Sequence, residues 1–482
     1  MLGYTSSVID HAFLFSPEHP NFGEKMTSQE AFEWQCHPKA EGLLLNILEK
    51  SCQANPFIAT FQQDLHKHTS TRLFDWLDHL VVGYSEHLEK ELEQTGFIAD
   101  IATPSYRVFH HPGAQLPRVV VKDHDEPIVA IAVSVESIAD FLMVRGISGW
   151  IEGAPLSGYR RCCISTENSV SLWVIERRAT LTMEPTYPED GYLERYLEAM
   201  EKWQSRPRVM DDEKEAMEMT LMLAQEIIAT VGVDLAAWIV LDCERRYWQM
   251  RNTAGQLQKN RQDRLGMGWA NHDHHTFRSS RKHFMQLVRL FEMLGFHCRE
   301  RYYAGKDAGW GAQIMENPQC RLVLFLDVDL AAYELEIDFA HHPIEPELEQ
   351  LGTIGLWCEL HGDSILNAGM HHLEAQFLFE ELTHDFAGMG VGMMAPFSSF
   401  SYLKQAFTAG EIWHVDPAKV QKLVEKEYIN QEQAEKFLHY GAVGSHLENL
   451  QRREGYKGFN KKNVSLIIKK TDPRTMPTSL GA

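Results

Sequence analysis

Residues 269–278, WANHDHHTFR, hold the highest density of potentially reactive side chains in this 482-residue chain. If residues 272–278 form a strand, successive side chains alternate between its two faces, so His274, Thr276 and Arg278 share one surface. A neutral imidazole is a common metal ligand, and a guanidinium holds a carboxylate through two parallel hydrogen bonds. The stretch therefore predicts a metal site that binds an organic acid. The alternative is a polar strand end with surface histidines.

Composition narrows the classes of partner. The formal net charge of -21 disfavours a general affinity for nucleic acid or for anionic membrane surfaces. The eight cysteines are scattered without a C-x-x-C pair, which is typical of reduced thiols in a cytoplasmic protein. The chain shows neither a basic start followed by an apolar run nor a stretch of about 20 uncharged apolar residues. We expect no targeting signal and no membrane span, and the sequence leaves the oligomeric state open.

The elements that must position these residues follow a repeated order. A strand, a helix and two or three further strands are predicted within residues 73–121, and the order recurs within residues 127–178. Residues 187–236 read as two helices, broken at Pro207 and ending at Gly232. The first order then returns, with Asp273-His274 in the place of Asp78-His79.

This repetition predicts an α+β fold of tandem βαβββ modules in two fused halves, with a helical connector and helical insertions. The predicted divisions are an N-terminal arm (1–39), an N-terminal pair of modules (40–186), the connector (187–236) and a C-terminal pair of modules (237–482). Short helices are expected at 28–36 and on either side of Asn55-Pro56. In the last module, helical spacing is read at 402–407, 418–427 and 431–439. The final strand is expected at 464–470, VSLIIKK, which was matched with VSLWVIERR from residue 170.

With these motifs the chain resembles the vicinal-oxygen-chelate superfamily, and within it the family of 2-oxoadipate dioxygenase/decarboxylase, also called 2-hydroxyglutarate synthase. That family carries Asp-His-x-Ala-x-Arg on its first metal-binding strand, and here residues 273–278 read DHHTFR. The resemblance implies that His274 binds the metal, Fe(II) in the family pattern, and that Arg278 binds a substrate carboxylate. Trp357, His361-Gly362 and the pair His371-His372 match the second module, and His372 is the favoured second ligand. The implied partners are a 2-oxo acid and dioxygen.

The departures from the family concern the third ligand and the N-terminal half. The family's glutamate belongs to the last strand, and the expected strand at 464–470 has no carboxylate, so Asp327, Asp329, Glu374 and Glu411 are left as unranked candidates. In the N-terminal half Gly83, Ala130 and Val174 stand where arginine, histidine and glutamate are needed. That half is therefore predicted to bind no catalytic metal, with His79 a core histidine. A duplicated fold without chemistry, serving as a binding or assembly module, is the competing reading, and an isomerase or lyase is a third.

Overall fold

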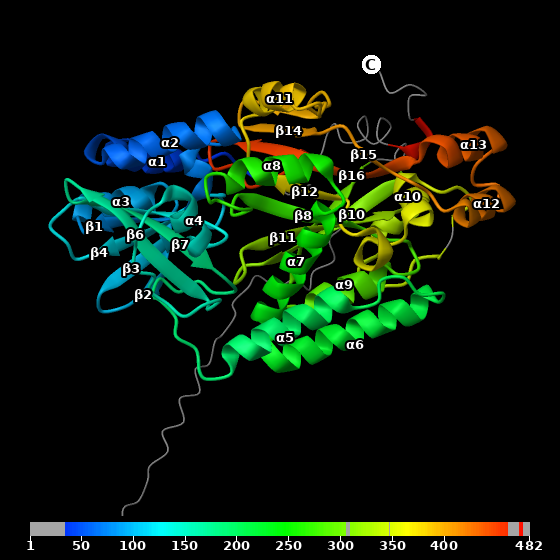
Figure 1. The fold of residues 1–482 in the computed structure, drawn as a ribbon, viewed down its shortest axis with the longest axis horizontal. Helices are drawn as coiled ribbons and strands as arrows, with labels where there is room; N and C mark the ends of the chain where they lie inside the picture. The colour runs from blue at the N-terminus through cyan, green and yellow to red at the C-terminus, as the bar shows by residue number, and fades with distance from the viewer. Residues whose placement is uncertain (1–33, 305–308, 347, 461–471, 476–482) are drawn as a thin grey trace, which may run out of the picture. The chain divides into compact units, whose positions relative to one another are not determined.

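The structure is a computed structural model that describes residues 34–304, 309–346, 348–460 and 472–475. The described residues from Gln35 onward group as one compact unit. Within the described residues, two mixed β-sheets with helices on their faces form an α+β fold (Figure 1). No helix among these residues is long and apolar enough to cross a membrane.

The N-terminal sheet has seven described strands in the order β2-β3-β4-β1-β5-β7-β6. Its strands are β1 (Leu77–Gly83), β2 (Ile98–Ala102), β3 (Tyr106–His110), β4 (Arg118–Lys122), β5 (Ile128–Ser134), β6 (Tyr159–Glu167) and β7 (Val170–Arg177). The associated helices are α1 (Pro38–Ala54), α2 (Pro56–Thr69), α3 (Glu86–Gln94) and α4 (Ile138–Arg145). The break between α1 and α2 falls at the predicted position, where Pro56 lacks a backbone donor and Asn55 caps the second helix.

The C-terminal sheet contains the predicted metal-binding stretch near its centre. Its order is β13-β14-β16-β12-β8-β11-β10-β9, and β15 pairs with β16 beside this path. Its strands are β8 (His272–Arg278), β9 (His297–Tyr303), β10 (Trp310–Asn317), β11 (Leu322–Asp329), β12 (His372–Ala375), β13 (Ser398–Phe400), β14 (Leu403–Phe407), β15 (Glu411–Trp413) and β16 (Ala442–Arg452). In each sheet the two central strands, β1 with β5 and β8 with β12, pair antiparallel.

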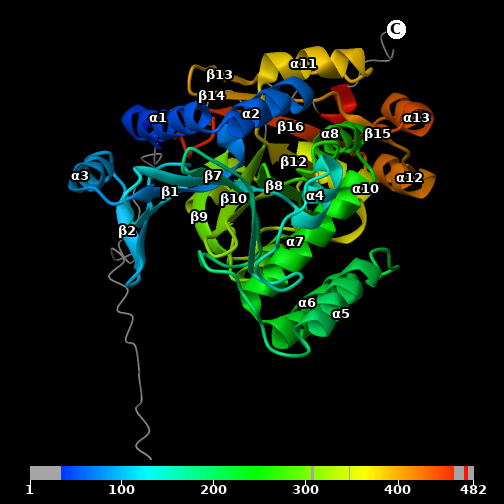
Figure 2. The same ribbon diagram turned by 60° about the vertical axis from the view of Figure 1, so that its left-hand side comes forward.

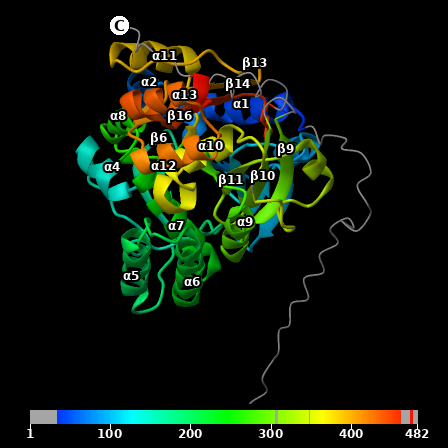
Figure 3. The ribbon, with the colours of Figure 1, turned by 90° about the vertical axis from the view of Figure 1, so that its right-hand side faces the viewer.

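Helices fill the connector and cover the second sheet. They are α5 (Tyr192–Ser205), α6 (Glu213–Val231), α7 (Val233–Gln249), α8 (Thr253–Asp263), α9 (Phe284–Met293), α10 (Thr353–His361), α11 (Phe379–Gly388), α12 (Pro417–Glu425) and α13 (Gln431–Tyr440). Helices α5 and α6 lie side by side in two views, as do α12 and α13 (Figures 2 and 3). One apolar core joins α5, α6, α7 and α9 to the inner face of the sheet, with Trp203, Phe277 and Phe291 among its fully buried members.

The predicted module order is confirmed, with local differences. The first and third modules run βαβββ, and the fourth runs β12-α11-β13-β14-β16 with β15, α12 and α13 inserted before β16, whereas the second has the described strands β5, β6 and β7, one fewer. Of residues 402–407, read as helical, Leu403–Phe407 form β14, which pairs antiparallel with β13 and β16 and is buried at four of its five residues. The two helices predicted after residue 417 are present as α12 and α13. The helix expected at 28–36 lies largely outside the described residues, and the division of the chain at 39, 186 and 236 stays a prediction.

The final strand of the fourth module is β16, and it corrects the sequence reading. Strand β16 pairs parallel with β12 in the same way that β7 pairs with β5. VSLWVIERR is therefore the counterpart of β16, and not of residues 464–470, which lie outside the described residues. The misreading has a physical source. A strand covered on both faces does not show clean apolar alternation, and β16 reads AVGSHLENLQR with nearly every residue buried.

Candidate metal centre

Strand β8 presents its two faces as the sequence predicted. His274, Thr276 and Arg278 line one cavity of about 80 Å³. Phe277 points the other way and packs in the core against Phe291, with ring centroids 5.1 Å apart. Alternation along an extended chain therefore separates the reactive side chains from the side chain that anchors the strand.

Strands β12 and β16 bring three further groups to the same cavity. Antiparallel pairing sets Glu374 opposite His274, and parallel pairing sets Glu448 beside Glu374. The potential ligand atoms of His274, Glu374 and Glu448 lie within 4.8 Å of one another, and all three residues are buried. His372 Nε2 lies 2.8 Å from Glu374 Oε1 and 3.5 Å from Glu448 Oε2. His274 Nε2 also contacts Glu374 Oε1, so the four side chains converge on one point.

Hydrogen bonds at the Nδ1 atoms of His274 and His372 orient both imidazole rings. His274 Nδ1 lies 2.9 Å from Asp273 Oδ1, and Arg452 donates to both oxygens of that aspartate at 3.0 and 3.2 Å. Burial opposes ionisation of Asp273, but the Arg452 guanidinium and His274 hold its pKa well below the ordinary value. A carboxylate behind an imidazole fixes the tautomer that leaves Nε2 free to bind a metal.

The structure distinguishes between the two adjacent histidines His371 and His372. Their Nδ1 atoms are 2.6 Å apart, so one donates to the other, and His372 lines the cavity. His371 instead packs against Trp357, with ring centroids 5.5 Å apart. His371 therefore supports His372 and does not itself face the cluster. Burial lowers the pKa of His274 to about 4 and that of His372 well below its ordinary value, so both imidazoles are neutral near pH 7.

The carboxylates of this cluster fit a bound cation. Burial raises the pKa of Glu448 to about 7, and burial together with the neighbouring Glu448 raises the pKa of Glu374 well above its ordinary value. Glu374 Oε2 has no hydrogen-bond partner among the described residues. Two carboxyl groups and two neutral imidazoles form a donor set that divalent metals accept, and a cation would offset the cost of burying both acids. The residues present therefore fit the implied metal.

Arg278 contributes a positively charged side chain to the same cavity. Its side chain is buried, its Nε has no partner, and within the described part of the chain no carboxylate forms an ion pair with it. Its guanidinium lies over the ring of Trp357 at 5.5 Å. Burial lowers the pKa of Arg278 to about 10 and raises that of nearby Asp327 to about 7. A buried guanidinium without a bonded carboxylate is a ready site for an anionic ligand.

The remaining walls of the cavity are largely apolar. Phe325 and Phe459 flank the His274 ring, with centroid distances of 4.6 and 4.7 Å. Gln405 donates to Glu448 Oε1 at 3.1 Å, and Asn460 N donates to Gln405 Oε1 at the same distance. The amide of Gln405 thus orients Glu448, while the aromatic rings keep water away from the polar cluster.

Of the four acids considered for the third ligand position, Glu374 lies in the cluster. Asp327 lines the cavity on the side of Arg278. Asp329 accepts from the backbone N–H groups of Ile354 and Gly355 at the start of α10, and Glu411 accepts from Thr253. Sequence reasoning missed Glu448. One sequence signal could have identified it. Glu448 and Arg452 are four residues apart, as are Trp173 and Arg177 in the corresponding strand β7.

The equivalent place in the N-terminal half contains apolar residues. His79 corresponds to His274, and its Nδ1 lies 2.7 Å from Asp78, which Arg177 also contacts. The strand register sets Ala132 opposite His79 and Trp173 beside Ala132, in the positions of Glu374 and Glu448. Ala130 takes the position of His372, as predicted. The glutamate position falls on Trp173, one residue before the predicted Val174.

A larger cavity of about 300 Å³ lies between the two sheets. Its lining contains many charged side chains, but these pair with one another, as Arg178 does with Glu176 and Arg245 with Asp242. It reaches the back of the cluster at Asp273 and does not include His274 or His372. The smaller cavity is therefore the candidate for chemistry.

Comparisons with known proteins concern the fold alone. No family model and no curated protein matches the chain. Among solved structures, a 4-hydroxymandelate synthase from Streptomyces coelicolor is 10% identical with a TM-score of 0.27, covering 83% of this chain and 98% of its own. The Mn(II)-bound glyoxalase from Novosphingobium aromaticivorans is 8% identical with a TM-score of 0.19, covering 79% of this chain and 83% of its own.

Neither similarity assigns the chain to a family. At such identities and TM-scores they carry no argument about substrate or reaction. The description of the fold therefore rests on the strand order and register of the chain itself.

Proposed function

We propose that this chain is a metal-dependent enzyme acting on a small 2-oxo acid, with His274, His372, Glu374 and Glu448 holding a divalent cation, Fe(II) in the first instance. The observation that carries the proposal is the convergence of these four side chains on a cavity that also contains the buried Arg278, which forms no ion pair with a carboxylate of the described residues. When bound, such an ion would act as a Lewis acid toward the oxygens of a 2-oxo acid and supply redox chemistry with dioxygen.

Arg278 supports a dicarboxylic substrate. It stands four residues from His274 on one strand face, a Cα separation of about 13 Å at roughly 3.3 Å per residue. Both side chains reach into the same cavity, so one end of a short acid can lie at the His–Glu cluster while the far carboxylate lies at the guanidinium. A cavity of about 80 Å³ favours a small acid over a bulky conjugate such as a coenzyme A thioester.

The protein's own groups would bind, orient and exclude water. Asp273 and His371 keep the Nε2 atoms of His274 and His372 directed into the cavity. The rings of Phe325, Phe407 and Phe459 form its dry walls. His274, His372, Glu374 and Glu448 would hold the ion, and the ion when bound would supply a Lewis acid for the oxygens of a 2-oxo acid.

The main argument for the non-catalytic alternative is an expected last strand without a carboxylate. Glu448 supplies a carboxylate from β16 and so weakens that argument. The test is to load the protein with Fe(II) and measure oxygen uptake with 2-oxoadipate and 2-oxoglutarate. We expect uptake that depends on metal and on the acid and that His274→Ala abolishes. Stoichiometric metal with no uptake or acid binding would reject the enzyme and leave a metal-binding module.

A further inference from the structure

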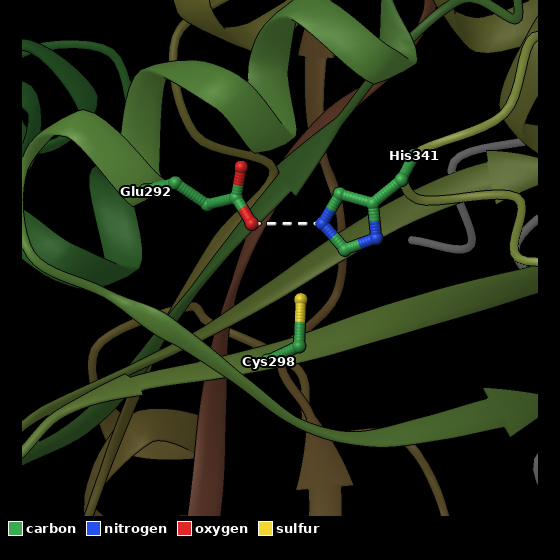
Figure 4. Close-up of side chains that lie close together, drawn as sticks. All are labelled: Glu292, Cys298 and His341. Carbon is green, nitrogen blue, oxygen red and sulfur yellow. Dashed lines mark hydrogen bonds and ion pairs between the residues drawn. The ribbon is translucent and has the colours of Figure 1, made fainter. Parts of the chain in front are cut away.

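A second group of metal-ligand side chains lies on the surface, apart from the His–Glu cluster. Glu292 comes from α9, Cys298 from β9 and His341 from the loop that follows residue 336 (Figure 4). Their ligand atoms all lie within 4.8 Å of one another, and all three residues are exposed. Figure 4 shows the carboxylate, the thiol and the imidazole directed toward a common space.

The imidazole at this place is oriented in the same manner as His274. His341 Nδ1 lies 2.7 Å from Asp338 Oδ2, and Arg301 forms an ion pair with that aspartate. His341 Nε2 then faces Glu292 Oε1 at 2.8 Å. The arginine–aspartate–histidine series matches Arg452, Asp273 and His274, although it is built from unrelated segments. A carboxylate on the far nitrogen of an imidazole is the usual support of a metal-binding histidine.

The cysteine adds a donor that a simple surface ion pair does not need. Cys298 lies on β9, the edge strand of the sheet, where the pairing with β10 shifts register between Ile314 and Met315. Such irregularities redirect side chains at sheet edges. The acids Glu292 and Asp338 lie near the Cys298 thiol. A bound cation would offset this excess of negative charge.

We propose that Glu292, Cys298 and His341 form a second metal site, selective for a zinc-class ion, with Asp338 orienting the histidine. One thiolate, one imidazole and one carboxylate are the donors that Zn²⁺ takes in tetrahedral sites, and three protein ligands leave the fourth position to water. The site is independent of the proposed function, because none of its residues lines the cavity of the His–Glu cluster. Binding displaces the protons of Cys298 and His341.

The test uses Co²⁺ as a probe on the full-length protein after treatment with a chelator. Co²⁺ bound to a thiolate gives a sulfur-to-metal charge-transfer absorption, which the His–Glu cluster cannot produce because it contains no sulfur. We expect this band to saturate at about one equivalent for the Cys298 site and to disappear when Zn²⁺ is added. It should persist in His274→Ala, which separates this site from the proposed enzyme.

Matched variants decide the assignment. Cys298→Ser should abolish the band, whereas Cys163→Ser, at an equally exposed cysteine on β6, should leave it unchanged. Asp338→Asn should keep the band but weaken Co²⁺ binding by roughly 10 to 100-fold, as expected for a group that orients a ligand. Absence of the band in the wild type, or its survival in Cys298→Ser with a folded protein, would overturn the proposal and leave a surface ion-pair network.

Discussion

His372 Nε2 lies 3.5 Å from Glu448 Oε2, across the parallel pair of strands β12 and β16. Parallel pairing in this register sets His372 beside His446 and Glu374 beside Glu448, so the two acids stand on neighbouring strands at one level. The last strand of the fourth module thereby completes a cluster whose other members come from β8 and β12.

Replacing Glu448 by Gln should therefore reduce the amount of bound metal. The amide cannot carry the negative charge that helps to hold a divalent ion, and the loss is expected in metal stoichiometry measured after dialysis against limiting Fe(II). Glu411→Gln is the matched control, since that acid contacts Thr253 outside the cluster and should leave the metal unchanged. Equal metal content in Glu448→Gln and wild type would remove Glu448 from the ligand set.

Replacing Arg278 by Ala should weaken substrate capture while the metal stays bound. The far carboxylate of the acid would then be buried without a partner, at a cost of roughly 2 to 5 kcal/mol. Isothermal titration of the metal-loaded, oxygen-free protein with 2-oxoadipate gives the affinity. A monocarboxylic 2-oxo acid serves as the control ligand, because it has no distal carboxylate to lose. If both acids bind the variant as well as the wild type, Arg278 is not the anchor.

In the N-terminal half, His79→Ala should change stability and leave the metal content as it is. His79 is buried and bonded to Asp78, so its removal leaves a buried carboxylate with one hydrogen bond fewer. We expect a loss of roughly 1 to 3 kcal/mol in the free energy of unfolding. Chemical denaturation and metal analysis of the same samples separate the two effects. A drop in metal content equal to that of His274→Ala would contradict the prediction.

The sequence predicted the β8 face, the module order and the loss of the histidine at Ala130, because these depend on local alternation and on residue types close in the chain. It missed Glu448 because β16 is polar and covered on both faces, so its hydrophobic pattern resembles a loop. The sequence also placed the N-terminal counterpart of the metal-binding glutamate at Val174, whereas the strand register places it at Trp173. A shift of one residue reverses which face a side chain occupies, and register between distant strands is not written in local sequence.

Glu244 on α7 should make the stability of the chain depend on pH in the acid range. It is fully buried and accepts from Trp203, Arg206 and Arg208, and the two arginines also donate to the carbonyls of residues 365 and 366. Burial works against its ionisation, but the two guanidinium groups lower its pKa below 4.5. Because the folded pKa is lower than the unfolded one, its stabilising contribution is complete above pH 4.5 and is lost as the pH falls through the folded value.

Glu244→Gln should therefore cost roughly 3 to 5 kcal/mol at neutral pH, since it leaves the buried Arg206 and the partly buried Arg208 uncompensated. The difference from wild type should shrink as the pH falls from the unfolded to the folded pKa of Glu244, because the carboxylate takes up a proton first in the unfolded chain and then in the folded one. Denaturant titrations at neutral pH and at several acid pH values measure the loss of stability and its dependence on pH. Glu226→Gln, which removes an exposed partner of Lys202 on α6, should leave the free energy of unfolding nearly unchanged at any pH. A deficit for Glu244→Gln that stays constant down to the acid transition would show that its charge does not stabilise the fold.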